Sequence, residues 1–382
     1  MIRRLKLTPS FKFVGLRSII FVVICCGCSA CAMFGQASAR PIEQVVYYAT
    51  TRAPASSAES LEYYGSKRGE LDLGIALVKL PADTNPKSFA KTFDFSGVSP
   101  LTTAGNSPAH ILQPRSKRLA WVAPVKQPEF LAKIDQALVD KNEKRLLFYI
   151  HGFKRNFGEN LESGARLAYE MAYPGPTVVF SWPSTNSLSG YIADRGNADW
   201  STPYLIQTLM DIHHQFPSYK IDLVAHSMGS RVLINLLLAF QQAQLEGASW
   251  PFAQVVMLAP DVDRALFVES YAGKLNGLLS HFTVYVSDDD FPLMASGTFN
   301  AYPRLGDSRS GVPVVAGMET VDVSNAITMA SGHAYYRKSH AVSHDLYLLL
   351  NKRLPARERE TLKASENASG VFWQVIAQSE EE

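Results

Sequence analysis

The chain has 382 residues, of which 47% are hydrophobic and 19% charged, a globular composition that suits one large domain with appendages or two modest domains. Its formal charge of +2 includes five basic residues and no acid within residues 1–39. The rest carries 32 Lys and Arg (37 − 5) against 35 Asp and Glu, a net charge of −3. This balance excludes a strongly basic protein and gives no reason to expect nucleic-acid binding.

Residues 1–39 predict an export signal. A basic stretch precedes the apolar segment 18–35, and small residues fit cleavage after Ala39. Two alternatives stay open. One is a lipoprotein signal lipidated at Cys28 or Cys31, although neither has the usual aliphatic residue three positions earlier; the other is an uncleaved anchor of minimal length. We expect a periplasmic or secreted protein, or, in the lipoprotein alternative, one attached to the outer membrane through this segment.

All the cysteines lie inside the predicted signal: Cys25, Cys26, Cys28 and Cys31. The mature chain therefore has no disulfide, no cysteine nucleophile and no thiolate metal site.

Residues 40–127 predict a strand-rich region with a loop insertion. The runs 44–50 and 71–80 are apolar or alternating and are bounded by turn residues, as in strands. Between about 95 and 125, Pro, Ser, Gly and Thr predominate, which favours a long loop. The segment 128–140 then places its apolar residues on one helical face.

A regular alternation of strands and helices follows, in a predicted catalytic core of residues 128–356. Strands are expected at 145–153, 177–184, 221–226, 254–263 and 282–290, and helices at 159–173, 201–216 and 228–243. Nearly continuous apolar strands separated by helices indicate an α/β fold with a doubly wound, mainly parallel sheet. Ligands of such sheets bind beyond the carboxyl ends of the strands. The charged tail, residues 357–382, is expected to be loosely ordered apart from an apolar patch at 371–377.

One serine lies where a predicted strand meets a predicted helix. In Ala225-His226-Ser227-Met228-Gly229, small residues flank the serine, a pattern typical of a nucleophile elbow, which projects the hydroxyl above the sheet. Ala225 replaces the commoner glycine. The alternative is a serine that only caps the helix.

The elbow fold places its base after the nucleophile and the acid in the chain. Three histidines follow late enough. His344 falls in a predicted helix and His340 in a short basic connection, whereas His333 lies on a loop before the last helix. We predict His333 as the base.

The predicted acid belongs to the run Asp288-Asp289-Asp290, at the end of the strand 282–290. Three adjacent carboxylates at a strand end otherwise form a solvated turn, and only one can face the histidine. Asp261 and Asp263, after the preceding strand, compete for the role. We predict Asp290, with Asp263 as the alternative acid.

Backbone N–H groups after two strands are candidates for an oxyanion hole. Met228 N–H follows the nucleophile. The turn His151-Gly152-Phe153 supplies Phe153 N–H, because glycine allows a close backbone approach. His151 is expected to structure this loop, and Gly152 and Trp182 are expected in the pocket wall.

Seven segments of the chain resemble a bacterial branch of the α/β-hydrolase (esterase/lipase) superfamily whose members are mainly hydrolases of unknown function. They are YYATTRAP, FYIHGF, FSWPS, LVAHSMGS, LAPDVD, VSDDDFPLMAS and SGHAYY. The resemblance covers roughly residues 44–355. It implies Ser227 as nucleophile, Asp290 as acid and His333 as base, with no metal or cofactor, and it supplies no substrate.

The sequence thus predicts an exported serine hydrolase that cleaves carboxylic esters through a Ser-His-Asp triad and an acyl-enzyme intermediate. The expected partner is a small-molecule or lipid ester, and no nucleic acid. An acyltransferase with the same triad stays open, as does a non-catalytic hydrolase-fold binding protein of the cell envelope.

Overall fold

The computed structural model describes residues 42–55, 63–81, 84, 117–245, 251–277, 281–326 and 332–376. The chain divides into two compact units, Met1–Arg40 and Pro41–Glu382, and all of these residues lie in the second. The predicted export signal, its four cysteines and most of the loop predicted at about 95–125 fall outside the described residues. Within the described ranges, no helix has the length and apolar character needed to cross a membrane.

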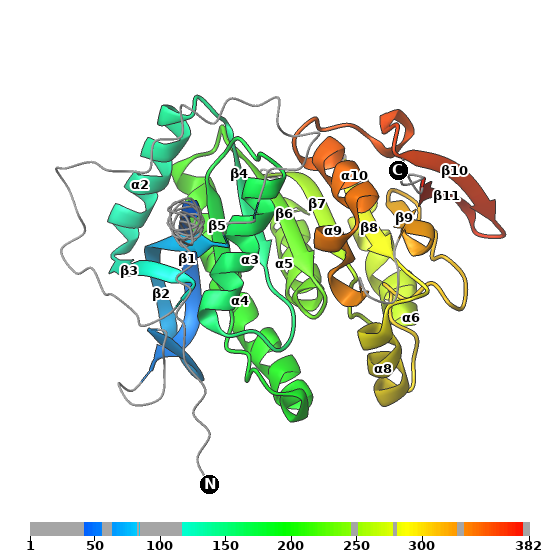
Figure 1. Ribbon diagram of the computed structural model, residues 1–382, viewed down its shortest axis with the longest axis horizontal. Helices are drawn as coiled ribbons and strands as arrows, with labels where there is room; N and C mark the ends of the chain where they lie inside the picture. The colour runs from blue at the N-terminus through cyan, green and yellow to red at the C-terminus, as the bar shows by residue number, and fades with distance from the viewer. Residues whose placement is uncertain are drawn as a thin grey trace, which may run out of the picture. The chain divides into compact units, whose positions relative to one another are not determined.

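The described strands form one sheet of 11 strands in the order β10-β11-β9-β8-β7-β6-β4-β5-β1-β2-β3 (Figure 1). Neighbours from β11 to β1 pair in parallel, and β10, β2 and β3 pair antiparallel at the two ends. The strands are β1 Ile42–Pro54, β2 Tyr64–Leu80, β3 Leu119–Val125, β4 Arg145–Ile150, β5 Thr177–Ser181, β6 Lys220–His226, β7 Phe252–Leu258, β8 Phe282–Val286, β9 Glu319–Asp322, β10 Leu362–Asn367 and β11 Gly370–Val375.

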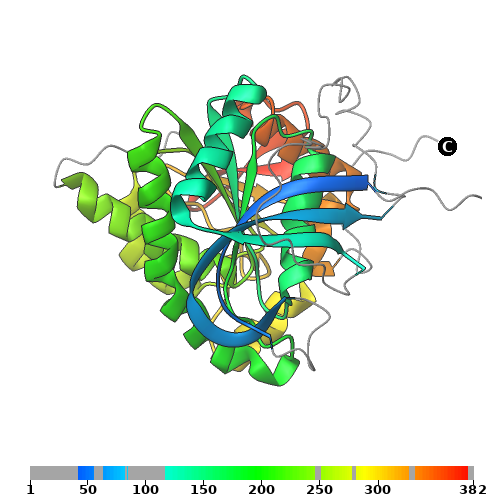
Figure 2. The same cartoon turned by 90° about the vertical axis from the view of Figure 1, so that its left-hand side faces the viewer.

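Helices cover both faces of this sheet, as Figure 2 shows from the side of β1 and β2. Alternate residues of β4 pack into two separate cores, Phe148 with α2, α4 and α5, and Tyr149 with α3 and α10. Burial on both faces confirms the predicted doubly wound, mainly parallel α/β sheet. The longer helices are α2 Gln127–Asp140, α3 Phe157–Glu170, α4 Tyr191–Gln215, α5 Gly229–Leu245, α8 Phe291–Asn300 and α10 His340–Leu350. Short turns of helix are η4 Leu188–Gly190, α6 Arg264–Leu266, η5 Phe267–Tyr271, α7 Ala272–Leu275, η6 Ser324–Ala326, η7 Gly332–Ala334, α9 Tyr335–Lys338 and η8 Ala356–Glu358.

Helix α4 begins earlier than the sequence predicts. The expected start was residue 201, because Ser201-Thr202-Pro203 has the composition of a helix N-terminus. In the structure α4 begins at Tyr191, and Pro203 lies inside it. The added turns carry Tyr191 and Ile192 to the carboxyl ends of the strands, where the predicted site lies.

Both flanking regions of the predicted core join the same sheet. Residues 119–125, expected to belong to a loop, form β3 against β2. The expectation of a loosely ordered tail is wrong for residues 362–370, which together with the excepted apolar patch form the β10–β11 hairpin, with β11 paired to β9. Arg359 fixes the preceding segment, since its buried guanidinium binds Asp345 at 2.7 Å and Glu319 at 2.9 Å. Some of the charge that suggested disorder is therefore neutralised inside the protein.

Candidate active site

Ser227 lies in a sharp turn between β6 and α5. Its φ is 53°, a left-handed conformation that is strained for a residue with a side chain. Its N–H donates to Leu258 O at 2.9 Å, and its carbonyl accepts from Asp261 N at 3.2 Å. Gly229 contributes because a Cβ at that position would collide with His151 O. The turn thus has the backbone conformation of the predicted elbow.

The turn after β4 packs directly against Ser227. A Cβ on Gly152 would lie 2.8 Å from Ser227 Cβ and 3.0 Å from His226 Nδ1, so only glycine permits this approach. Phe153, the next residue, lines the same cavity as Ser227. Among the described residues, neither Phe153 N–H nor Met228 N–H is taken up by another protein group. Both donors are therefore available to a ligand oxygen.

The structure brings His333 and Asp290 together. His333 Nδ1 lies 2.9 Å from Asp290 Oδ1 and 2.8 Å from Oδ2. A carboxylate can only accept, so Nδ1 carries the proton, and Nε2 of the neutral ring is left with a free lone pair. The Asp290 side chain is buried, whereas the His333 ring is partly exposed.

The backbone after β8 explains why Asp290, of three consecutive aspartates, faces the histidine. Asp288 is exposed and Asp289 half-buried, whereas Asp290 is buried. Asp290 is also the N-cap of α8, where Oδ1 accepts from Leu293 N at 3.1 Å. With Pro292 in the first turn, this cap fixes where α8 begins and aims the carboxylate at His333.

His226, within the elbow motif, supports the His333 loop, a role that was not predicted from the sequence. Its ring lies 4.6 Å from the His333 ring, and its Nε2 lies 3.1 Å from His333 O. Because a carbonyl only accepts, Nε2 is the donor. Burial, with the nearby His333, lowers the pKa of His226 well below its ordinary value, so the ring is neutral.

Ser227 and His333 both line a cavity of 930 Å³ at the carboxyl ends of the strands. Its other walls come from the turn after β4, from η4 and the start of α4, and from α8. Within the described ranges, the Ser227 hydroxyl makes no hydrogen bond to the His333 ring. Such contacts in free enzymes are often long and shorten when substrate binds. No group of three or more His, Cys, Asp or Glu among the described residues is arranged to hold a metal ion.

Several residues predicted for the site, or weighed for it, lie elsewhere. Trp182, expected in the pocket wall, is fully buried below the cavity, where its ring stacks on His151 at 4.5 Å and its Nε1 donates to His151 O. The large Trp182 ring fills part of the hydrophobic core and does not line the pocket. Asp263, the alternative acid, caps α6 by accepting from Leu266 N at 3.0 Å. His340 and His344 lie on α10, away from the residues that line the cavity.

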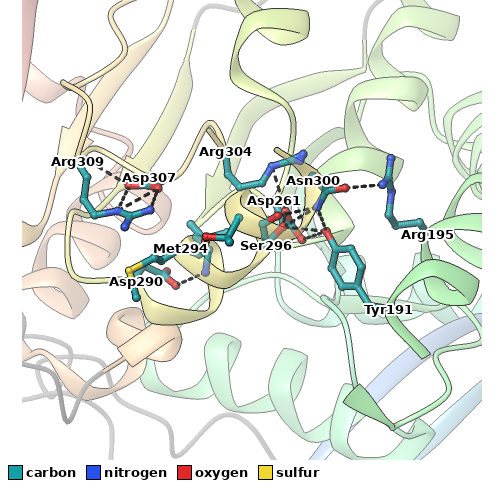
Figure 3. Close-up of polar contacts among 12 residues, drawn as sticks. Tyr191, Arg195, Asp261, Asp290, Met294, Ser296, Asn300, Arg304, Asp307 and Arg309 are labelled. Atoms are coloured by element: carbon teal, nitrogen blue, oxygen red, sulfur yellow. Dashed lines mark hydrogen bonds and ion pairs between the residues drawn. The ribbon is translucent and has the colours of Figure 1, made fainter. Parts of the chain in front are cut away.

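Asp261 lies at the centre of a polar network that joins two walls of the cavity (Figure 3). Its buried carboxylate accepts from Tyr191 Oη at 2.8 Å and from Ser296 Oγ at 2.6 Å, and Arg304 Nε lies 3.5 Å away. Asn300 also donates to Tyr191 Oη, at 3.2 Å. From the sequence, Asp261 was considered only as a competing acid. Its partner Tyr191 was not predicted, because α4 was expected to begin at residue 201. The network holds α4 and α8 to the end of β7.

Comparison with known proteins identifies one curated relative. The chain is 31% identical to the uncharacterized protein alr1448 of Nostoc sp. strain PCC 7120, in a match that covers 31% of the chain and 38% of that relative. The chain therefore spans much less than two thirds of the relative's length.

Two solved structures share a weak likeness with the chain. One is phospholipase PlaB from Legionella pneumophila in complex with thio-NAD, and the other is a second structure of that phospholipase. The TM-scores are 0.32 and 0.29, with identities of 10% and 12%; the matches cover 61% of this chain in both cases, and 67% and 68% of the other chains. This likeness is too low to bear on activity.

A family model matches the larger part of the sequence. It is described as alpha/beta hydrolase of unknown function (DUF900), and it matches residues 126–353. These residues run from α2 to the end of α10 and include the elbow, the turn after β4, and the loops that carry Asp290 and His333. The match spans more than half of the chain and agrees with the observed sheet. The chain belongs to this family of α/β-hydrolases.

Proposed function

We propose that the protein is an exported serine hydrolase that cleaves carboxylic esters through Ser227, His333 and Asp290. The observation that carries the proposal is the cavity lined by both Ser227 and His333, with His333 hydrogen-bonded to the buried Asp290. Export is part of the proposal on the basis of residues 1–39 alone.

In the first half of the reaction, the Ser227 Oγ attacks the ester carbonyl carbon while His333 Nε2 takes the hydroxyl proton. The charge that develops on the carbonyl oxygen is stabilised by Phe153 N–H and Met228 N–H. The C–O bond to the alcohol then breaks, and His333 returns the proton to the departing alkoxide. Asp290 keeps Nδ1 protonated throughout and stabilises the imidazolium.

In the second half, water attacks the acyl-enzyme and His333 takes a proton from it. The tetrahedral intermediate forms in the same oxyanion site. When the bond to Ser227 breaks, His333 protonates Oγ, so the free acid leaves and the enzyme returns to its first state.

Replacing Ser227 tests this proposal. Ser227→Ala should abolish hydrolysis of short p-nitrophenyl esters and covalent labelling by a fluorophosphonate probe, because the proposed acyl-enzyme forms on the Ser227 oxygen. Ser230→Ala, on the first turn of α5, is a matched control in the same segment. Labelling that persists in Ser227→Ala, at a position found by mass spectrometry, would contradict the assignment.

A further inference from the structure

The active-site cavity has two chemically different walls. Four large apolar side chains with unusually high exposure line it, namely Leu188 (73% exposed), Ile192 (66%), Phe291 (69%) and Phe299 (62%). They come from η4, the start of α4 and the two ends of α8. Clustering of such side chains around a cavity indicates a surface that is covered when a ligand binds.

Another part of the cavity lining is cationic. Lys154 and Arg155, which follow the predicted oxyanion donor Phe153, both line the cavity, and neither forms an ion pair among the described residues. Glu159 also lines it, but its Oε2 accepts from Asn156 N in the cap of α3. The cations therefore face the cavity without a carboxylate committed to them.

The backbone that carries these cations is held firmly. Arg155 N donates to Ser184 Oγ at 3.2 Å, and Arg155 O accepts from the buried Arg52 at 2.7 Å. Lys154 has a φ of 58°, a left-handed conformation, and its side chain is exposed. Arg155 and the elbow serine Ser227 line the same cavity.

We propose that the cavity binds amphiphilic esters, with an apolar acyl chain between α4 and α8 and an anionic group, carboxylate or phosphate, on the leaving alcohol at Lys154 and Arg155. This proposal rests on the proposed function, which puts the scissile bond at Ser227, in the cavity that both walls line. Lys154 is exposed, so an anionic alcohol bound there leaves directly into water, while the apolar groove retains the acyl chain on Ser227.

The cationic wall is tested with pairs of esters that share one acyl chain and differ by one anionic group. One pair is 4-nitrophenyl octanoate and 3-carboxy-4-nitrophenyl octanoate, and a second is 1-octanoylglycerol and its 3-phosphate. The wild type should show a kcat/KM about tenfold higher for the anionic member of at least one pair. The pair that shows the preference identifies the anion as carboxylate or phosphate. In the double variant Lys154→Gln/Arg155→Gln, the ratio within that pair should fall to about one, and added salt should lower it in the wild type. The control is Arg357→Gln, which replaces an exposed arginine outside the cavity.

The apolar wall is tested by chain length. The wild-type ratio of kcat/KM for 4-nitrophenyl octanoate to that for the acetate should exceed one, and Ile192→Ser should lower it several-fold by removing apolar contact. Val139→Ser, on α2, replaces an equally exposed aliphatic residue away from the cavity and should keep the wild-type ratio.

Three results would overturn the proposal: equal kcat/KM within both charged pairs, a charge preference that survives the double variant, or no preference for octanoate over acetate. Each of these can occur while Ser227-dependent hydrolysis and fluorophosphonate labelling persist. Loss of the proposed function itself appears differently, as an absence of Ser227-dependent turnover and labelling with every ester.

Discussion

Asp290 uses one carboxylate for two contacts, the cap of α8 and the hydrogen bond to His333. The two roles can be separated, because asparagine caps a helix about as well as aspartate but carries no charge. A neutral amide can also present its N–H₂ group to Nδ1 and so favour the wrong tautomer of His333.

Asp290→Asn should therefore keep α8 folded and lower kcat by about 10³- to 10⁴-fold. The measurement is ester hydrolysis under saturating substrate, with thermal unfolding to verify the fold. Asp263→Asn is the control, since Asp263 caps α6 and does not touch His333. A larger kcat loss in Asp263→Asn than in Asp290→Asn would assign the acid to the other strand end.

Buried histidines make stability depend on pH. Burial, with the charge of Arg52, lowers the pKa of His151 well below its ordinary value. In the unfolded chain an imidazole titrates near pH 6.5. Below that pH the unfolded state takes up a proton that the folded state excludes, so the free energy of unfolding decreases as the pH falls. Above pH 6.5 the ring is neutral in both states, so His151 no longer makes the free energy of unfolding depend on pH.

His151→Gln should reduce this dependence. Between pH 6.5 and 5, the slope of the free energy of unfolding should be smaller than in the wild type by up to about 1.4 kcal/mol per pH unit. Urea denaturation at several pH values measures it, and His214→Gln, at an exposed histidine of α4, is the control. An unchanged slope in His151→Gln would show that His151 is protonated in the folded state.

At the scale of secondary-structure elements, Asp261 connects three of them, β7, α4 and α8. It follows β7, and through Tyr191 and Ser296 it fixes the start of α4 and the middle of α8. Arg304 is buried with it, and the two side chains are 4% and 5% exposed. Removing the carboxylate would leave a buried guanidinium without its counter-charge.

Asp261→Ala should thus lower the free energy of unfolding by about 3–5 kcal/mol. Asp263→Ala, two residues further along, should cost only about 1 kcal/mol, the loss of a helix cap. Chemical denaturation of both variants gives the comparison. Similar losses in the two would mean that the Asp261 network adds little beyond local capping.

The elements that position the site were predictable to different degrees. The strand ends that carry Ser227 and Asp290 were predictable from the sequence, because buried parallel strands are continuous apolar runs and their carboxyl ends share one edge of the sheet. The start of α4 was not predictable, because the first turns of this helix lie over the cavity and their apolar residues do not recur with a helical period. The β10–β11 hairpin was missed because its alternation is short and charged, and its stability depends on pairing with β9, far away in the sequence.

For the molecule as a whole, the C-terminal segment is an integral part of the sheet. The buried ion pairs of Arg359 connect this segment to the interior. Arg359→Ala should lower the free energy of unfolding by about 3–5 kcal/mol, because Asp345 is left as an unpaired buried charge. Arg357→Ala removes an exposed arginine paired with Glu358 and should cost less than about 1 kcal/mol. Equal stability of the two variants would mean that the segment is held by β11 alone.

The place of β1 within the sheet has a consequence for synthesis on the ribosome. Strand β1 can pair with β2 soon after both are made, but its other neighbour is β5, where Tyr47 lies opposite Val178. The edge of β1 that pairs with β5 therefore stays unpaired until 131 further residues (178 − 47) have been translated. Such an edge readily pairs with other chains. Until β5 has been made, the nascent chain is therefore more open to pairing with other chains along β1 than the finished protein is.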